Sequence, residues 1–213
     1  MTRLSPSSLN IFLECPRCFW LYLNKNIKRP SIPVATITTG LDRVIKEYFN
    51  LYRRENKLPA MLEGKVPGKL MRNFPNRGWL EFTDAKMDAR LGGYLDDCLQ
   101  LEDNCYAALD HKTRGSRPTE THKAHRFQMD TYTFLLERNG LPTRRKAYLV
   151  YYIPKAVISR EAIDFEVYVC EVNTDPGIAE SVFYAALSVL KQAIPQAAQD
   201  CAFCKWTQTL NIK

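Results

Sequence analysis

Two carboxylates and a lysine near the middle of the chain have the types and spacing of a metal-dependent hydrolytic site. Asp96 closes the segment 93–96, and Asp110-His111-Lys112 follows after thirteen further residues. Alternate residues of a β-strand share a face, so Asp110 and Lys112 project together while His111 points the other way. Two carboxylates with retained water can hold Mg²⁺, and a neighbouring ammonium can polarise a phosphate or orient a water. The pattern predicts phosphodiester hydrolysis.

An acidic residue two before a lysine is a common fragment, so its context has to select the functional copy. Such a tripeptide arises by chance about once in a chain of this size. Three other copies are expected on the solvated surface: Glu55-Asn56-Lys57, Glu63-Gly64-Lys65 and Asp84-Ala85-Lys86. Only the copy at 110–112 follows an Asp-bearing strand and an apolar run, and precedes an amphipathic helix.

Composition limits the class of protein. The 213 residues contain no Gly/Ser/Pro-rich linker, so a single domain over 1–213 is expected. Apolar residues make up 46% and aromatic residues 11%, which excludes a disordered chain. Neither an apolar N-terminal leader nor a membrane-length apolar run is present, so a cytoplasmic protein without a membrane partner is expected.

The charge balance favours a polyanionic partner. The net charge is +7 and the pI is about 9.0. Basic residues also cluster directly after the candidate site, at Arg114, Arg117, Lys123 and Arg126. A nucleic-acid phosphate backbone is therefore the expected ligand.

Hydrophobic periodicity predicts the elements that would position the site. Ser7-Ser8 can cap a helix that Pro16 interrupts, and a second helix is expected over 40–54. The Pro- and Gly-punctuated residues 55–80 predict loops and a short helix. A strand pair over 91–113 with a turn at 102–104, a helix over 121–138, strands over 147–153 and 165–172, and a helix from about 176 to 190 complete the expected α/β order.

Four of the seven cysteines form two pairs at opposite ends of the chain. The pairs are Cys15-Pro16-Arg17-Cys18 and Cys201-Ala202-Phe203-Cys204. A two-residue gap lets both thiolates reach one metal centre, so these residues predict a site that joins the segments 1–30 and 195–213. Four thiolates suit tetrahedral zinc or an iron–sulfur cubane. Core packing is expected for the remaining cysteines, which are Cys98, Cys105 and Cys170.

The order of these motifs resembles the PD-(D/E)xK nuclease superfamily, and in particular its RecB-type branch, which includes CRISPR-adaptation exonucleases and the nuclease domains of helicase–nuclease complexes. The resemblance rests on four segments: Ser5 to Arg17, Gly93-Tyr94-Leu95-Asp96, Leu109 to Thr113, and Gln128-Met129-Asp130-Thr131-Tyr132. It implies a restriction-endonuclease-like core with a small mixed β-sheet flanked by helices.

The resemblance also implies roles for individual residues. Asp96 and Asp110 would bind Mg²⁺ or Mn²⁺, with a backbone carbonyl near His111 as a further ligand, and Lys112 would orient the attacking water. Gln128 and Tyr132, four apart on a helix, would contact the carboxylates or the DNA strand. Asp97 is the alternative to Asp96 but should face the other side of its strand.

The chain departs from the RecB-type pattern at two places. That pattern has a metal-binding histidine on the early helix, whereas the segment 40–44 offers none, and Asp42 or Glu47 is a candidate substitute. A zinc site at His122 and His125 is weighed against a solvated helix start, which is favoured. The RecB-type cysteines ligate a 4Fe-4S cluster, with three near the C-terminus; here Cys18 would replace the missing third one. A 4Fe-4S cluster is expected, with structural Zn²⁺ as the alternative.

The resemblance implies a single-strand-preferring DNA exonuclease in repair, recombination or CRISPR adaptation, acting with a helicase or a CRISPR integrase. A non-catalytic nucleic-acid-binding subunit with a structural iron–sulfur or zinc site is the alternative from another class. A zinc-stapled RNA-processing protein is a third.

Overall fold

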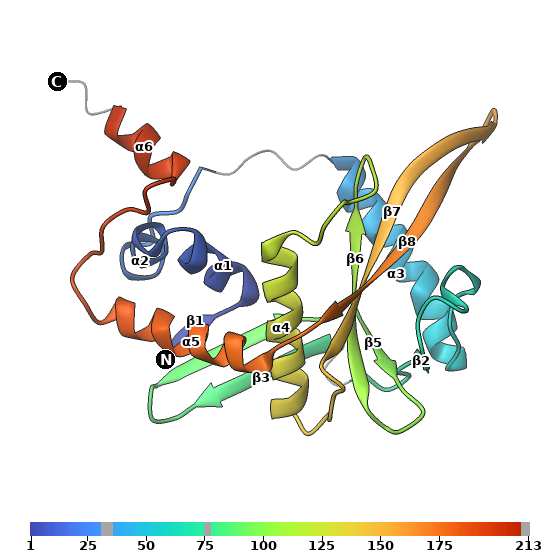
Figure 1. Ribbon diagram of the computed structural model, residues 1–213, viewed down its shortest axis with the longest axis horizontal. Coiled ribbons are helices and arrows are strands. Elements are labelled where there is room, and N and C mark those ends of the chain that lie inside the picture. Colours follow the sequence, from blue (N-terminus) through green and yellow to red (C-terminus); the bar gives the residue numbers. More distant parts are fainter. Residues whose placement is uncertain (31–35, 75–77, 210–213) are drawn as a thin grey trace.

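The computed structural model describes residues 1–30, 36–74 and 78–209, and its strands divide between two mixed sheets (Figure 1). The smaller sheet has the order β1-β4-β3, with bounds Thr2–Leu4, Ala89–Tyr94 and Trp79–Asp84. The larger sheet has the order β2-β5-β6-β7-β8, with bounds Lys69–Leu70, Asp97–Gln100, Tyr106–Thr113, Lys146–Ser159 and Ala162–Asn173. In the larger sheet β6 and β7 are parallel and the other neighbours are antiparallel.

Helices α4 and α3 cover opposite faces of the larger sheet. The helices of the described ranges are α1 (Pro6–Glu14), α2 (Pro16–Lys25), α3 (Thr36–Glu55), the 3-10 turn η1 (Ala60–Leu62), α4 (Lys123–Arg138), α5 (Pro176–Leu190) and α6 (Ala202–Thr209). Within the described ranges no helix has both the length and the apolar composition that a bilayer crossing requires.

Two hydrophobic clusters lie on opposite faces of the larger sheet. On one face Met129 of α4 packs in a cluster with Ala108 and Leu149 of the sheet. On the other face Phe49 of α3 packs in a cluster with Leu109. Since successive strand residues point to opposite faces, neighbours in β6 enter different clusters. The predicted α/β fold with a mixed sheet between helices is confirmed.

The chain crosses from the smaller sheet to the larger one at Leu95 and Asp96. Strand β4 ends at Tyr94 and pairs with β1 and β3, whereas β5 begins at Asp97 and pairs with β6. The strand pair predicted over 91–113 is therefore wrong in its first member, which is two strands with Asp96 in a bend between them. A Cβ on Gly93 would lie 3.2 Å from the Tyr132 ring, so a glycine lets α4 approach this crossing closely.

The N-terminal helix begins earlier than its sequence pattern predicts. Ser5, rather than Ser7 or Ser8, is the N-cap: its Oγ accepts a hydrogen bond from the Ser8 N–H, and the Ser8 Oγ accepts one from the Ser5 N–H. This is a capping box. Pro16 interrupts the helix as predicted, but it also begins α2, because proline is accommodated in the first turn of a helix.

The β7–β8 hairpin is longer than predicted and projects from the body of the protein (Figure 1). Its outer half exposes Val157, Ile158 and Ile163. The sequence pattern detected only the inner half, where β7 is buried continuously from residue 147 to 153. The loop region predicted at 55–80 contains η1 and β2, and its residues 75–77 lie outside the described ranges.

Candidate active site

Strand β6 presents Asp110 and Lys112 to helix α4, as their spacing predicts. Asp110 is 2% exposed and forms an ion pair with Lys112. The Lys112 Nζ also donates to Oε1 of Gln128 at 3.0 Å. Lys112 therefore contacts both the carboxylate beside it on β6 and a side chain of α4.

Gln128 connects the strand residues to the helix. Its Nε2 donates to Oδ1 of Asp110 at 3.2 Å and to the Tyr132 hydroxyl at 2.8 Å. Residues four apart share a helix face, so Gln128 and Tyr132 both reach the carboxylate side. Tyr132 is buried at 5% exposure, and burial and the Asp110 charge raise its pKa, so it remains a neutral phenol. The structure thus brings together four of the predicted site residues.

Asp96 lies at the crossing between the sheets, beside these residues. Its Oδ2 accepts a hydrogen bond from the His111 backbone N–H at 3.1 Å, which fixes it against β6. Its Oδ1 forms an ion pair with Lys46 of α3 at 3.1 Å, and Lys46 also contacts Asp42 at 2.9 Å. The side chain of Asp96 is 18% exposed, so it forms the accessible edge of the site.

The adjacent acidic residue, Asp97, belongs to the opposite face. It is fully buried, forms an ion pair with Arg53, and its Oδ2 lies 3.1 Å from Nε2 of His111. The other ring nitrogen of His111 lies 3.1 Å from the Tyr152 hydroxyl. Both ring nitrogens therefore have partners on the α3 side, and any contribution of residue 111 to a metal would come from its backbone, as the resemblance implies.

The electrostatics of Asp110 fit a bound cation. Burial raises the pKa of Asp110 to about 6; the Lys112 charge opposes this rise and the Asp96 charge adds to it. Its Oδ2 is buried and has no hydrogen-bond partner beyond the Lys112 ion pair. A buried carboxylate next to a second carboxylate is stabilised by a divalent cation, and oxygen ligands are those that Mg²⁺ and Mn²⁺ prefer. Asp96 and Asp110 fit such an ion.

Lys46 contacts Asp96 from α3, the early helix on which the RecB-type pattern has its metal-binding histidine. Asp42 reaches Asp96 only through the Lys46 ammonium, and Glu47 is exposed and pairs with Arg43. Neither acidic residue therefore approaches Asp96 as a co-ligand. In the sequence, only the spacing of four residues from Asp42 distinguishes Lys46. Surface ion pairs on helices commonly have this spacing, so it does not identify a site residue.

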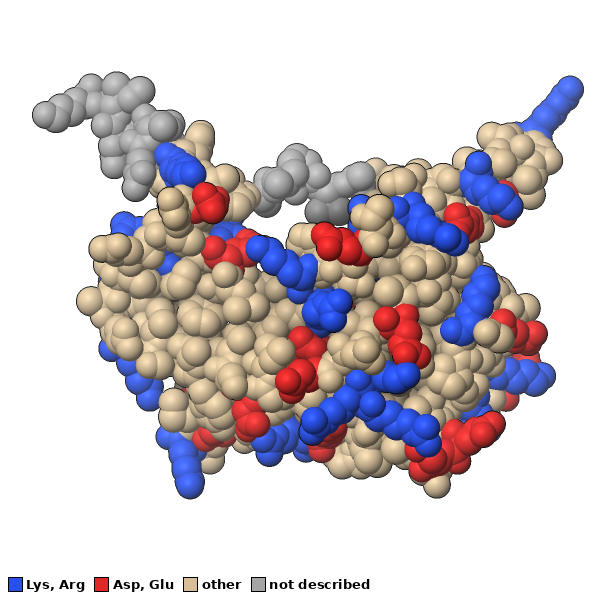
Figure 2. All heavy atoms as spheres, in the orientation of Figure 1, with Lys and Arg blue, Asp and Glu red and all other residues tan. Residues whose placement is uncertain are grey.

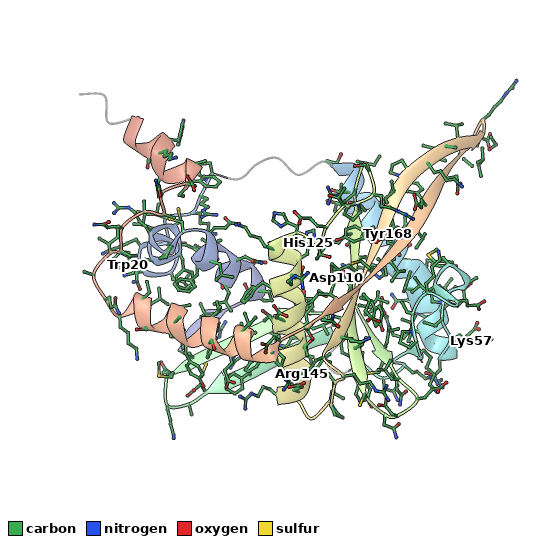
Figure 3. The ribbon with its side chains drawn as sticks, in the orientation of Figure 1. Trp20, Lys57, Asp110, His125, Arg145 and Tyr168 are labelled. Carbon is green, nitrogen blue, oxygen red and sulfur yellow. The ribbon has the colours of Figure 1, made fainter. Side chains whose placement is uncertain are left out.

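His125 is a further residue that the sequence analysis did not place in the site. It lies one turn before Gln128 at the start of α4, above Asp110 (Figure 3). Burial, followed by the charges of Lys112, His122 and Arg114, lowers its pKa to about 4, so the ring is neutral. His122 caps the helix through its Nδ1. Within the described ranges, these two histidines do not join a metal-binding group.

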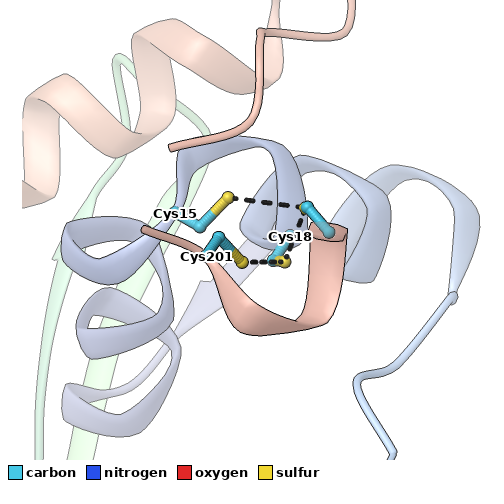
Figure 4. A group of neighbouring side chains, drawn as sticks. Cys15, Cys18 and Cys201 are labelled. Carbon is cyan, nitrogen blue, oxygen red and sulfur yellow. Dashed lines mark hydrogen bonds between the residues drawn. The ribbon is translucent and has the colours of Figure 1, made fainter. Parts of the chain in front are cut away.

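The four paired cysteines converge, as predicted, and join the two ends of the chain (Figure 4). Their sulfur atoms all lie within 4.8 Å of one another, with Cys18 at 3.6 Å from both Cys201 and Cys204. Sulfurs around one tetrahedral zinc, with Zn–S near 2.3 Å, lie about 3.8 Å apart. The donor set therefore fits a single metal ion.

The thiols do not share one electrostatic environment, since the pKa of Cys15 is lowered whereas burial and the neighbouring thiols raise that of Cys204. Burial raises the pKa of Cys15, but hydrogen bonds from the backbone N–H groups of Ala198 and Cys18 and from neighbouring thiols bring it to about 7. Burial raises the pKa of Cys18, and a hydrogen bond from Arg29 opposes that rise. Of the other cysteines, Cys98 is buried in the core as predicted, while Cys105 and Cys170 are only partly buried.

Comparisons with known proteins bear on this geometry. The model of the PD-(D/E)XK nuclease superfamily matches residues 41–209, well over half of the chain. The chain belongs to the PD-(D/E)XK nuclease superfamily. No curated protein matches the sequence. A solved structure described as "Crystal structure of SSO0001" is similar at a TM-score of 0.46 and 13% identity, covering 89% of this chain and 76% of that one.

The raised pKa of Asp110 predicts that Asp110→Asn stabilises the protein when no Mg²⁺ or Mn²⁺ is added. The folded protein holds the Asp110 proton more tightly than the unfolded chain, so ionisation costs stability above the folded pKa; this cost begins to fall as the pH drops below about 6 and is gone only below the ordinary carboxyl pKa of about 4. The variant should gain about 1–3 kcal/mol in free energy of unfolding at pH 7.5. Urea unfolding at pH 7.5 and 5 measures this.

The decisive quantity is the change, between pH 7.5 and pH 5, in the stability difference between Asp110→Asn and the wild type. The gap between variant and wild type should shrink at pH 5, where the wild-type residue carries its proton. Asp97→Asn is the matched control, because its carboxylate is fully buried against Arg53 and His111; that variant should lose stability at pH 7.5. A gap for Asp110→Asn that is equal at both pH values, or a loss of stability at pH 7.5, contradicts the assignment.

Proposed function

We propose that the protein is a Mg²⁺- or Mn²⁺-dependent deoxyribonuclease that hydrolyses single-stranded DNA from an end. The observation that carries the proposal is the linked set of Asp110, Lys112, Gln128 and Tyr132, with Asp96 beside it. Membership of the nuclease superfamily supports the reaction class. The preference for single strands, the exonuclease action and a role in repair, recombination or CRISPR adaptation beside a helicase or an integrase rest on the RecB-type resemblance.

The residues of the site divide the chemical tasks. Asp96 and Asp110 would hold the divalent cation, which, when bound, polarises a phosphoryl oxygen and lowers the pKa of a bound water. Lys112 donates hydrogen bonds, so it orients the attacking water and offsets the negative charge that develops on the phosphate. Gln128 fixes the Lys112 ammonium against Asp110, and Tyr132 in turn fixes Gln128.

The surface charge supports a nucleic-acid substrate. The chain carries a net charge of +7, and Figure 2 shows Lys and Arg side chains spread over the viewed face among acidic ones. Distributed cations of this kind attract a phosphate backbone without reading its sequence. A non-catalytic DNA-binding subunit is the second candidate, because Lys46 already neutralises Asp96 and, among the described residues, no histidine side chain pairs with it.

Cleavage of end-labelled DNA distinguishes the two candidates. The wild type should shorten a single-stranded oligonucleotide in Mg²⁺ or Mn²⁺, and Lys112→Ala should lower the rate by about 10²–10⁴-fold, because the attacking water is no longer oriented. Lys86→Ala removes the same charge from an exposed turn and should cleave normally. Tight binding without cleavage by the wild type in either metal would support the non-catalytic candidate instead.

For the cysteine centre we propose one zinc ion in place of the iron–sulfur cluster expected from the sequence. A cubane binds each thiolate to a different iron, which requires the sulfurs to stand farther apart than a single ion does. Here Cys15 and Cys204 lie 3.9 Å apart and the Cys18 contacts are shorter. The four clustered cysteines would hold the ion and so link α1 and α2 to the start of α6. The role of the zinc would be structural.

Metal analysis after oxygen-free purification tests the zinc proposal. We expect about one zinc per chain and no visible absorption, and Cys204→Ser should lose the metal and unfold at lower temperature, because structural zinc contributes folding free energy. Cys105→Ser is the control and should keep its metal, since Cys105 lies outside the cluster. Iron and sulfide in equal amounts with a broad visible absorption would contradict zinc and restore the cubane.

A further inference from the structure

A pocket of about 500 Å³ adjoins the candidate active site on the side away from α4. Its lining includes Lys46 of α3, Arg72 and Phe74 after β2, and Tyr94 and Asp96 at the sheet crossing. The volume lies within the range of small-ligand sites, about 300–1,000 Å³. Because Asp96 lines the pocket and also belongs to the catalytic set, a ligand in the pocket would lie next to the scissile phosphate.

The pocket has cationic groups that protein contacts leave available. The Lys46 ammonium has three donors, and its described partners are two carboxylates, Asp42 and Asp96. Arg72 is exposed, and among residues 1–30, 36–74 and 78–209 no acidic side chain pairs with it at ion-pair distance. Arg53 also lines the pocket but is held by buried Asp97. Lys46 and Arg72 can therefore take a phosphate.

An aromatic ring faces solvent at the same pocket. Tyr94 is 65% exposed, and Trp79 supports its ring at a centroid distance of 4.8 Å. A Cβ on Gly92 would lie 2.5 Å from the Trp79 ring, so the glycine makes room for this support. A large ring held exposed beside cationic side chains is the arrangement that binds single-stranded nucleic acid, where bases stack on aromatics and cations hold the backbone.

We propose that this pocket is a subsite for one unpaired nucleotide of the substrate strand, with its phosphate on Lys46 and Arg72 and its base against Tyr94. The inference rests on the proposed nuclease function and specifies its substrate. In a duplex the faces of a base are occupied by its stacking neighbours, so only an unpaired base can occupy the subsite. The pocket thereby gives a physical reason why the active site that contains Asp96 would prefer single-stranded DNA.

The base contact is tested in a binding assay, without cleavage, that combines Tyr94 variants with DNA strands lacking one base. Binding of labelled single strands, each with one abasic position, is measured by fluorescence anisotropy with no Mg²⁺ or Mn²⁺ added. Wild-type affinity should fall about 5- to 100-fold at one abasic position, as expected for one lost stacking contact. Tyr94→Ala should lose the same affinity for intact DNA and show no further loss at that position, whereas Tyr94→Phe should behave as wild type.

The phosphate contacts give a second, independent readout. Lys46→Gln and Arg72→Gln should each weaken binding of all strands equally and lower the salt dependence of log K by about 0.7. Lys86→Gln, at the exposed β3–β4 turn, is the matched control and should change neither. An abasic penalty that persists in Tyr94→Ala overturns the subsite.

Parallel cleavage assays separate the two proposals. Normal wild-type cleavage together with an abasic penalty that Tyr94→Ala retains would remove the subsite and leave the nuclease. If the wild type never cleaves DNA, but shows an abasic penalty that Tyr94→Ala abolishes, the nuclease proposal fails and the nucleotide-binding pocket remains.

Discussion

The site depends on one electrostatic constraint: Asp110 is buried beside a second carboxylate, Asp96, and both charges must be held there. Burial raises the pKa of Asp110, and the neighbouring carboxylate adds to the cost of its charge. Lys112 and Gln128 offset part of that cost from one side. Because Asp96 lies where the chain passes between the two sheets, the meeting of the sheets sets the separation of the carboxylates. A bound cation would complete the balance.

The opposite face of the same strands supplies rigidity. Alternation sends Asp97 and His111 toward α3, where Arg53 and Tyr152 complete a buried polar chain. Breaking a buried ion pair costs about 3–5 kcal/mol, so this network holds the strands whose other face carries the candidate active site. The cysteine centre acts at longer range, because it anchors α1, and Asn10 of α1 donates to the Ala124 carbonyl at the start of α4.

Residues whose geometry follows from local periodicity were predictable from the sequence. The shared face of Asp110 and Lys112, the opposite orientation of Asp97, and the helix face of Gln128 and Tyr132 all follow from periods of two and 3.6. Long-range features were not: Lys46 reaches Asp96 only because α3 packs across the sheet. The division into two sheets was missed for the same reason, since β1 pairs with β4 across more than eighty residues of sequence.

Titration calorimetry with Mn²⁺ at pH 7.5 measures whether Asp96 and Asp110 form a metal site. One site is expected in the wild type, weakened at least about tenfold in Asp96→Asn through loss of a charged ligand. Asp97 is one residue along the chain but lies on the buried α3 face. The folded fraction of Asp97→Asn should therefore bind Mn²⁺ with the affinity of the wild type. Equal affinity in wild type and Asp96→Asn would contradict the assignment of the carboxylate pair as the metal site.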